Sequence, residues 1–170
     1  NGNEPENASS DVSGTTQMSS VNYGAKLSAN GFSLLGWTFQ GWNTLPNGTG
    51  TSFANEATID STFPFAPDPN NPENPNISFN SLYAQWKPNT FNIAYANGGG
   101  TGTNPTSPVK CTYDSNCTAP ANPYTRTGYT FTGWACTGGG TSCDGDIIGA
   151  NNSIKNATAT NGATITLTAQ

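Results

Sequence analysis

The feature that most constrains this chain is an internal repeat. The segment GWTFQGWN at residues 36–43 returns as GYTFTGWA at residues 128–135, with five identical positions at a spacing of 92 residues. Further on, Ala84-Gln85 returns as Ala169-Gln170 at a spacing of 85 residues. Recurrence at a fixed spacing indicates tandem copies of one structural unit. We therefore predict two small modules, residues 1–87 and residues 88–170.

The boundaries of the repeat do not coincide with the ends of the sequence. In the second module an alternating segment at 91–95 precedes a Gly/Thr-rich loop, whereas the similar loop of the first module begins at Asn1. The first module is therefore expected to lack its first strand. The second is expected to lack its final tryptophan, because Trp86 follows Gln85 but nothing follows Gln170. Both observations suggest an excerpt from a longer array.

Composition and patterning favour a folded, mainly β protein. Charged residues make up 9% of the 170 residues and aromatic residues 11%, while Gly, Asn, Thr, Ser and Pro supply many turns. No segment shows a clear helical period, so any helix is expected to be short. The net charge of −5 and five scattered basic residues argue against nucleic acid as a partner. The apolar runs are too short to insert into a membrane.

Alternating apolar residues locate the main strands. Residues 91–95 place Phe91, Ile93 and Tyr95 on one face, and the closing strands at 78–86 and 164–170 alternate in the same way. Residues 21–27 and 109–113 are shorter candidates, and 51–59 holds a strand or a helical turn. In the strand at 37–42, alternation places Trp37 and Phe39 on one face and Trp42 on the other. A glycine inside each copy of this strand, at 41 and 133, indicates a bulge or a close backbone approach.

The repeated aromatic residues have two interpretations. Their size favours core packing, whereas an exposed tryptophan flanked by polar groups would suit sugar stacking. We predict a structural core formed by Trp37, Phe39, Trp42, Trp86, Tyr129, Phe131 and Trp134.

Three loops are expected at the surface. An Asn-Gly turn occupies residues 45–50, a proline-rich segment occupies 63–76, and a glycine-rich segment occupies 137–142. Because function concentrates on loops held by a rigid scaffold, these loops are the candidate contact sites. Their candidate contact residues are Asn47, Asp68, Asn70, Glu73 and Gly139.

The four cysteines fall as two close pairs in the second module, Cys111 with Cys117 and Cys136 with Cys143. Zinc knuckles normally have two to four residues between cysteines, whereas five and six residues separate these pairs. Local disulfides that each close a turn are therefore favoured over a zinc site, and they imply an oxidising compartment.

The residues give little support to catalysis. The chain has no histidine, the commonest general base and metal ligand. Asp144 and Asp146 could form a carboxylate pair or a calcium loop, but they fall well short of an EF-type loop, and a hydrophilic turn after Cys143 is favoured. The oxygen-rich segment 68–74 is stiffened by prolines. We expect neither enzymatic activity nor a cofactor or metal.

The motifs resemble a known family. G-x-T-F-x-G-W followed by an A-Q-W ending is similar to the Listeria–Bacteroides repeat, also called the internalin B-repeat, and residues 122–129 resemble its proline–arginine lead-in. The resemblance implies a β-grasp-like (α+β) module of bacterial extracellular and surface proteins, usually in tandem and without catalytic residues. The cysteine pairs are not part of the usual motif.

Three functions remain open at this stage. The first is an extracellular stalk of a bacterial surface protein, with two modules joined head to tail as a semi-rigid rod by the short linker 87–90. The second is an adhesin that binds a glycan or protein through its loops. The third is a filament subunit, in which identical subunits exchange strands. The expected partners are neighbouring repeats or identical subunits.

Overall fold

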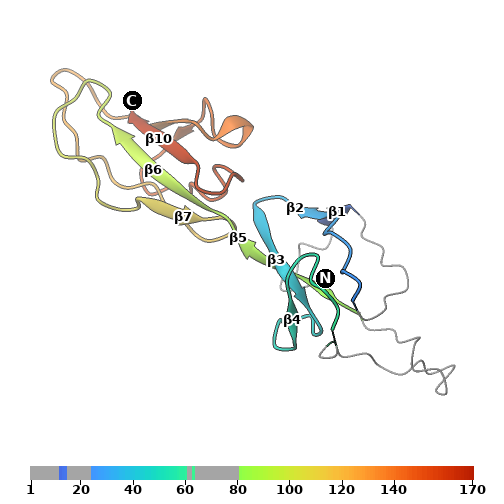
Figure 1. Ribbon diagram of the computed structural model, residues 1–170. Coiled ribbons are helices and arrows are strands. Elements are labelled where there is room, and N and C mark those ends of the chain that lie inside the picture. Colours follow the sequence, from blue (N-terminus) through green and yellow to red (C-terminus); the bar gives the residue numbers. More distant parts are fainter. Residues whose placement is uncertain (1–11, 15–23, 61–62, 64–80) are drawn as a thin grey trace, which may run out of the picture. The chain divides into compact units, whose positions relative to one another are not determined.

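The computed structural model describes residues 12–14, 24–60, 63 and 81–170 (Figure 1). Its contacts divide the chain into two units. Unit 1 comprises the described residues up to Leu35 together with Phe39–Lys87, and unit 2 comprises Gly36–Thr38 and Pro88–Gln170. Nearly all regular structure in the described residues is β, as the sequence predicted, and the one helix among them is the 3-10 turn η2 (Gly140–Ser142).

Unit 2 is built on a five-stranded sheet. Its strands are β6 (Thr90–Ala96), β7 (Lys110–Thr112), β8 (Trp134–Thr137), β9 (Ile147–Ile148) and β10 (Thr164–Ala169), in the spatial order β7-β6-β10-β8-β9. The central pair, β6 and β10, is parallel, with Ile165 opposite Ile93. The neighbours on either side are antiparallel. The first and last strands of the unit therefore lie side by side in the middle of the sheet.

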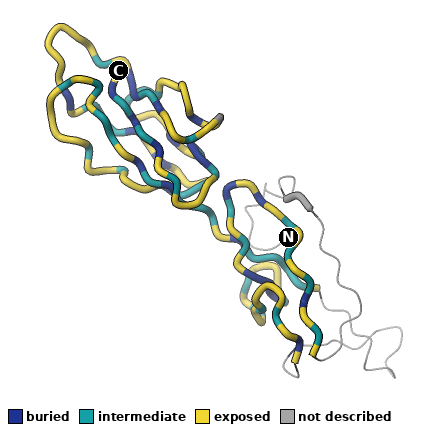
Figure 2. Tube along the Cα trace, turned by 45° about the horizontal axis from the view of Figure 1, so that its top comes forward, coloured by how far each residue is buried: buried dark blue, intermediate teal, exposed yellow. Residues whose placement is uncertain are grey.

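The two central strands bury the residues that alternation predicted, except Tyr95 of β6, which is half-buried against the same core. Phe91 and Ile93 of β6 and Ile165, Leu167 and Ala169 of β10 are buried, while the threonines between the β10 residues are more exposed. Figure 2 shows burial concentrated along these strands and exposure along the loops. Their side chains join Trp134 and both cysteine pairs in one core.

Unit 1 contains two smaller sheets. β1 (Val12–Gly14) pairs with β2 (Phe32–Leu34), and β3 (Trp37–Asn43) lies between β4 (Ser52–Phe53) and β5 (Tyr83–Pro88). The buried core of this unit comprises Leu27, Trp42, Ile59 and Phe63, with Leu82 and Ala84 packed against it. β4 resolves the ambiguity at residues 51–59 in favour of a short strand. In the described part of the candidate strand at 21–27, only an isolated bridge between Lys26 and Thr58 forms.

The repeat is visible in the hydrogen bonds as well as in the sequence. In unit 1, Leu27 N donates to Ala57 O (2.9 Å) and Ile59 N donates to Ala25 O (2.8 Å). In unit 2, the corresponding bonds join Ala119 to Asn152 (2.8 Å) and Ile154 to Cys117 (2.9 Å). The spacing between the copies is 92 residues before the β3–β4 and β8–β9 hairpins and 95 residues after them. The hairpin of unit 2 is therefore three residues longer.

Unit 2 also takes in the short segment Gly36–Thr38. Asn89 N donates to Gly36 O (2.8 Å), and Trp37 Nε1 donates to Asp114 Oδ2 (3.3 Å). Trp37 is half-buried in this arrangement. Its indole is therefore held by a polar contact. The sequence predicted that Trp37 belongs to the structural core, but it is not part of the buried core of unit 1.

Candidate functional site

In each unit, the buried tryptophan of the repeated motif contacts an equivalent pair of aromatic rings, and Trp134 also meets Tyr95 at 5.6 Å. In unit 1, the Trp42 ring meets Phe39 at 5.1 Å and Phe32 at 6.1 Å, both edge to face. In unit 2, Trp134 meets Phe131 at 5.3 Å and Tyr124 at 6.0 Å with the same orientation. Such edge-to-face pairs are favoured by the ring quadrupoles. The repeated motif therefore builds the same aromatic cluster twice.

The prediction that Phe39 and Trp42 lie on opposite faces of the strand is wrong. The reason is Gly41, which has a φ of +139° and would place a Cβ 2.6 Å from Phe53 O. Its backbone conformation interrupts the alternation and brings Phe39 onto the face of Trp42. Gly133 has the same conformation, with φ +153°. The bulge or close approach predicted at these glycines is thus present and overrides the period-two pattern.

A repeated asparagine positions one aromatic ring of each cluster. The Asn30 amide accepts a hydrogen bond from Phe32 N (2.9 Å) and donates to Phe32 O (3.0 Å). Asn122 makes the same two bonds to Tyr124, at 3.0 and 2.9 Å. The side-chain amide thus pairs with the aromatic residue's backbone as a neighbouring strand would. Sequence reasoning missed this pair, although extending the repeat alignment at 92 residues would have found it.

The loop after β3 closes around Asn43, whose side chain is fully buried. Its Oδ1 accepts hydrogen bonds from Leu45 N (2.9 Å) and Gly50 N (3.0 Å). Its Nδ2 lies within hydrogen-bond distance of Gly48 O (3.1 Å), Gly50 O (3.2 Å) and Ser52 Oγ (2.9 Å). A single side chain therefore fixes the predicted turn at residues 45–50.

Unit 2 has Ala135 at the position of Asn43 and closes its longer loop with a disulfide. Cys136 is bonded to Cys143, with a Cα–Cα distance of 5.6 Å. Directly after this loop, Asp144 Oδ1 accepts a hydrogen bond from Gly139 N (2.8 Å), which lies within it. Asp144 thus stabilises the turn, and the described residues include no group of three or more His, Cys, Asp or Glu that could hold a metal ion.

The second disulfide joins Cys111 of β7 to Cys117, with a Cα–Cα distance of 6.0 Å. Cys117 O also accepts the hydrogen bond from Ile154 N. The disulfide therefore connects the edge strand β7 to Cys117, which is bonded in turn to the buried Ile154. The local pairing predicted from the cysteine spacings is the one observed.

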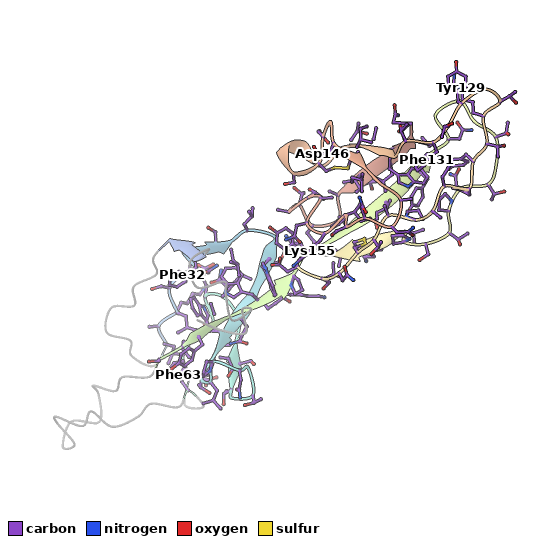
Figure 3. The ribbon with its side chains drawn as sticks, turned by 180° about the vertical axis from the view of Figure 1, so that it is seen from behind. Phe32, Phe63, Tyr129, Phe131, Asp146 and Lys155 are labelled. Carbon is purple, nitrogen blue, oxygen red and sulfur yellow. A yellow bond between two sulfur atoms is a disulfide. The ribbon has the colours of Figure 1, made fainter. Side chains whose placement is uncertain are left out.

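One residue assigned to the core is in fact exposed. The Tyr129 side chain is 67% exposed and projects from a loop of unit 2 (Figure 3). The guanidinium of Arg126 lies 4.0 Å from its ring centroid, within the range of a cation–π interaction. Arg126 Nη1 also donates to Gly98 O (3.1 Å). The prediction that Tyr129 belongs to the core was therefore wrong. Trp37, at the same position of the repeat, is half-buried and donates a hydrogen bond to Asp114, and Tyr129 has no equivalent contact in the described residues.

Beside Tyr129 lies a groove of about 520 Å³, at the end of β10. Phe131 and Ala169 contribute apolar surface to it. Polar groups come from Asn97, Asn122, Arg126 and Gln170. It combines an exposed aromatic ring with amide and guanidinium groups, which makes it the principal candidate binding site in the described residues.

Two tyrosines of unit 2, the half-buried Tyr95 and the buried Tyr124, have shifted pKa values. Burial raises the pKa of Tyr95 to about 12, and the neighbouring Tyr124 adds to the shift. Burial also raises the pKa of Tyr124. Both hydroxyls donate hydrogen bonds, Tyr95 to Pro108 O (2.6 Å) and Tyr124 to Asn104 Oδ1 (2.8 Å). These tyrosines therefore act as neutral structural donors at physiological pH.

The predicted contact residues fall into different environments. Asn47 is exposed and its Oδ1 accepts hydrogen bonds from Thr49 N and Oγ1, at 3.1 and 2.8 Å. Gly139 is half-buried against Ala157 O and Cys143 Sγ, and it has no room for a side chain. Asp68, Asn70 and Glu73 lie outside the described residues.

Comparison with known families decides the identity of the repeat. Residues 7–63 and 91–153 each match the Listeria-Bacteroides repeat domain, and together they cover more than half of the chain. The chain belongs to this family. The Listeria-Bacteroides repeat is associated with bacterial surface proteins and is typically a structural module without catalytic activity. No curated protein and no solved structure matches the chain.

The two family matches coincide with the two aromatic clusters described above. Within the part of the chain that is described, no helix is long and apolar enough to cross a membrane.

Proposed function

We propose that this pair of Listeria-Bacteroides repeats is a non-enzymatic stalk segment that extends or displays other domains at a bacterial cell surface. One observation carries the proposal. The aromatic, glycine and asparagine positions shared by both copies, such as Trp42/Trp134, Gly41/Gly133 and Asn30/Asn122, serve packing or backbone geometry. What the repeat preserves is therefore a fold and not a binding site.

We further propose that each repeat is a β-grasp-like module. The order β7-β6-β10-β8-β9, with the first and last strands parallel at the centre, supports this topology. The connection between β7 and β8 contains no helix in unit 2, so the module would be a β-grasp without its usual helix. A single residue, Asn89, separates β5 from β6, and this short connection supports a head-to-tail, semi-rigid rod of neighbouring repeats.

Two disulfides in a chain of this size support an extracellular location, because such bonds persist in oxidising compartments. The matching measurement is the intact mass of the secreted protein without reductant. We expect a mass lower by four hydrogens than that of the reduced chain. A fully reduced chain recovered from its native location would contradict the compartment assignment.

The stalk function predicts that length matters and loop chemistry does not. Replacing this chain, in its parent surface protein, by an unrelated rigid spacer of equal length should preserve the activity of the displayed domains. The matched control is a deletion without replacement, which should reduce that activity. Saturable binding of the purified chain to a glycan or protein, abolished by substitutions at residues 45–50 or 137–142, would instead favour the adhesin function and refute the stalk proposal.

A further inference from the structure

The boundary of unit 2 does not follow the boundary of the sequence repeat. By its contacts, the segment Gly36–Thr38 belongs to unit 2, although Leu35 before it and Phe39 after it belong to unit 1. The segment comes from the repeated motif of the first copy, 50 or more residues before β6 begins. Two residues of unit 2, Asn89 and Asp114, hold it through hydrogen bonds.

Asn89 binds the segment with both its backbone and its side chain. Its N–H donates to Gly36 O (2.8 Å), and its Oδ1 accepts a hydrogen bond from Thr38 Oγ1 (2.5 Å). Its remaining groups bond elsewhere in unit 2, because Asn89 O accepts from Tyr113 N (2.8 Å) and Nδ2 donates to Ala159 O (2.8 Å). One residue therefore connects the segment to two separate parts of unit 2.

Asp114 binds the indole that lies between these two contacts. Its Oδ2 accepts the hydrogen bond from Trp37 Nε1 (3.3 Å). Its other groups are held by Asn156, whose Nδ2 donates to Asp114 Oδ1 (2.8 Å) and whose Oδ1 accepts from Asp114 N (2.6 Å). Lys155 Nζ lies 3.7 Å from Asp114 Oδ1. The carboxylate is thus positioned independently of the indole, and an ionised acceptor makes a stronger hydrogen bond than a neutral one.

These contacts define which segment fits. The first residue is glycine, because Gly36 has a φ of +77° and a Cβ there would overlap the Tyr113 ring. The second needs a long side chain with a donor that reaches the carboxylate of Asp114. The third needs a hydroxyl group for Asn89 Oδ1. The sequence Gly-Trp-Thr meets all three requirements.

We propose that Asn89, Tyr113 and Asp114 form a docking surface for a Gly-Trp-Thr segment of the preceding repeat, and that this segment stabilises unit 2. It would therefore unfold with unit 2 and not with the rest of β3. The proposal rests on the stalk function and deepens it, because it names the residues through which one repeat stabilises the next. In a tandem array, such a contact adds a nearest-neighbour term to the stability of the following repeat.

A urea titration of the whole chain can show with which unit Trp37 unfolds. Each of the four tryptophans gives one indole Nε1–H signal in the ¹H–¹⁵N spectrum, and Trp42 reports on unit 1 while Trp134 reports on unit 2. We expect the urea midpoint of Trp37 to equal that of Trp134. The titration is repeated with Asn43→Ala, which destabilises unit 1 and separates the two transitions. A Trp37 midpoint that follows Trp42 would overturn the proposal.

A double-mutant cycle tests the contact itself. Trp37→Phe removes the indole N–H and keeps an aromatic ring, so it should lower the urea midpoint of unit 2 by at least about 0.3 M. Asp114→Gly removes the acceptor and tolerates the φ of +57° at this position. It should lower the midpoint less in the Trp37→Phe chain than in the parent chain, because one of its contacts is already absent.

The matched control is Tyr129→Phe, which removes a donor at the same position of the repeat but within unit 2. Because the Tyr129 side chain is exposed, this change should shift the midpoint of unit 2 less than Trp37→Phe does. Equal shifts for these two variants, or equal effects of Asp114→Gly in both chains, would refute the docking surface. Either result would leave the stalk function standing, since a spacer of independent units still extends the domains that it displays.

Discussion

Replacing Asn43 by alanine should destabilise unit 1 far more than a usual loop substitution does. The side chain is fully buried and connects five atoms of one loop. Alanine can provide none of these contacts. Without the Asn43 side chain, three backbone groups of the loop lose a hydrogen-bond partner: Gly48 O, Gly50 O and Gly50 N. Water would have to replace it.

The expected cost follows from the capacity of one amide group. A side-chain amide has two donor hydrogens and two acceptor lone pairs, so it makes at most four full hydrogen bonds, each contributing about 0.5–1.5 kcal/mol net. The sum is roughly 2–6 kcal/mol. Because Leu45 is exposed, water can reach part of the loop, and we expect a loss of about 2–4 kcal/mol in the free energy of unfolding of unit 1.

A urea titration followed by NMR can measure this loss unit by unit. The indole signals of Trp42 and Trp86 report on unit 1, and that of Trp134 reports on unit 2. The matched control is Asn47→Ala in the same loop, because Asn47 is exposed and bonds only to Thr49 in the described contacts. It should cost less than about 0.5–1 kcal/mol. Equal losses for the two variants, or an equal loss in unit 2, would refute the assignment of Asn43 as the centre of the loop.

Three further predictions use the same titration. Reducing both disulfides should lower the free energy of unfolding of unit 2 by about 2–2.5 kcal/mol for each bond and leave unit 1 unchanged; equal losses in both units would contradict this. Gly41→Ala should destabilise unit 1 more than Gly24→Ala, because both glycines have positive φ but only at Gly41 would a Cβ meet a backbone atom, Phe53 O. Because the pKa of Tyr95 is raised in the folded state, the unfolded state releases this proton at a lower pH. The free energy of unfolding should therefore fall as the pH rises from 10 toward about 12, and Tyr95→Phe should weaken this pH dependence.

The parts of the fold that follow a simple period could be predicted from the sequence. β10 alternates apolar and polar residues without interruption, and β6 does so up to Ile93. Their buried residues lie on the predicted faces, although Tyr95 of β6 is only half-buried. The pairing of the cysteines followed from their short spacing. In each case the determining interaction is local, so a few adjacent residues contain enough information.

The failures arise where distant residues decide the environment. Gly41 was recognised as unusual, but its effect on the faces of β3 depends on how close Phe53 approaches. Tyr129 and Trp37 occupy the same motif position, yet only Trp37 is held by Asp114, which is 77 residues away. Asn43 was missed because nothing in a single asparagine indicates that a loop will close over it.

The candidate site was predicted least well. The groove forms from the ends of β6 and β10 and from the lead-in segment, which are far apart in the sequence. Of the residues chosen for contact, the two that the structure describes, Asn47 and Gly139, do not line it.

The two disulfides of unit 2 also determine how the chain would respond to tension along its backbone. Each bond crosslinks the two ends of a loop, so the loop between them cannot be stretched. The sequence separations are six and seven residues, and the bonded Cα atoms are about 6 Å apart. At about 3.3–3.6 Å per extended residue, the fully extended length of the oxidised unit would be roughly 30–35 Å shorter than that of the reduced unit. Unit 1 has no such internal stop, so a pulled chain would lengthen unequally in its two halves, and oxidation would set the limit in only one of them.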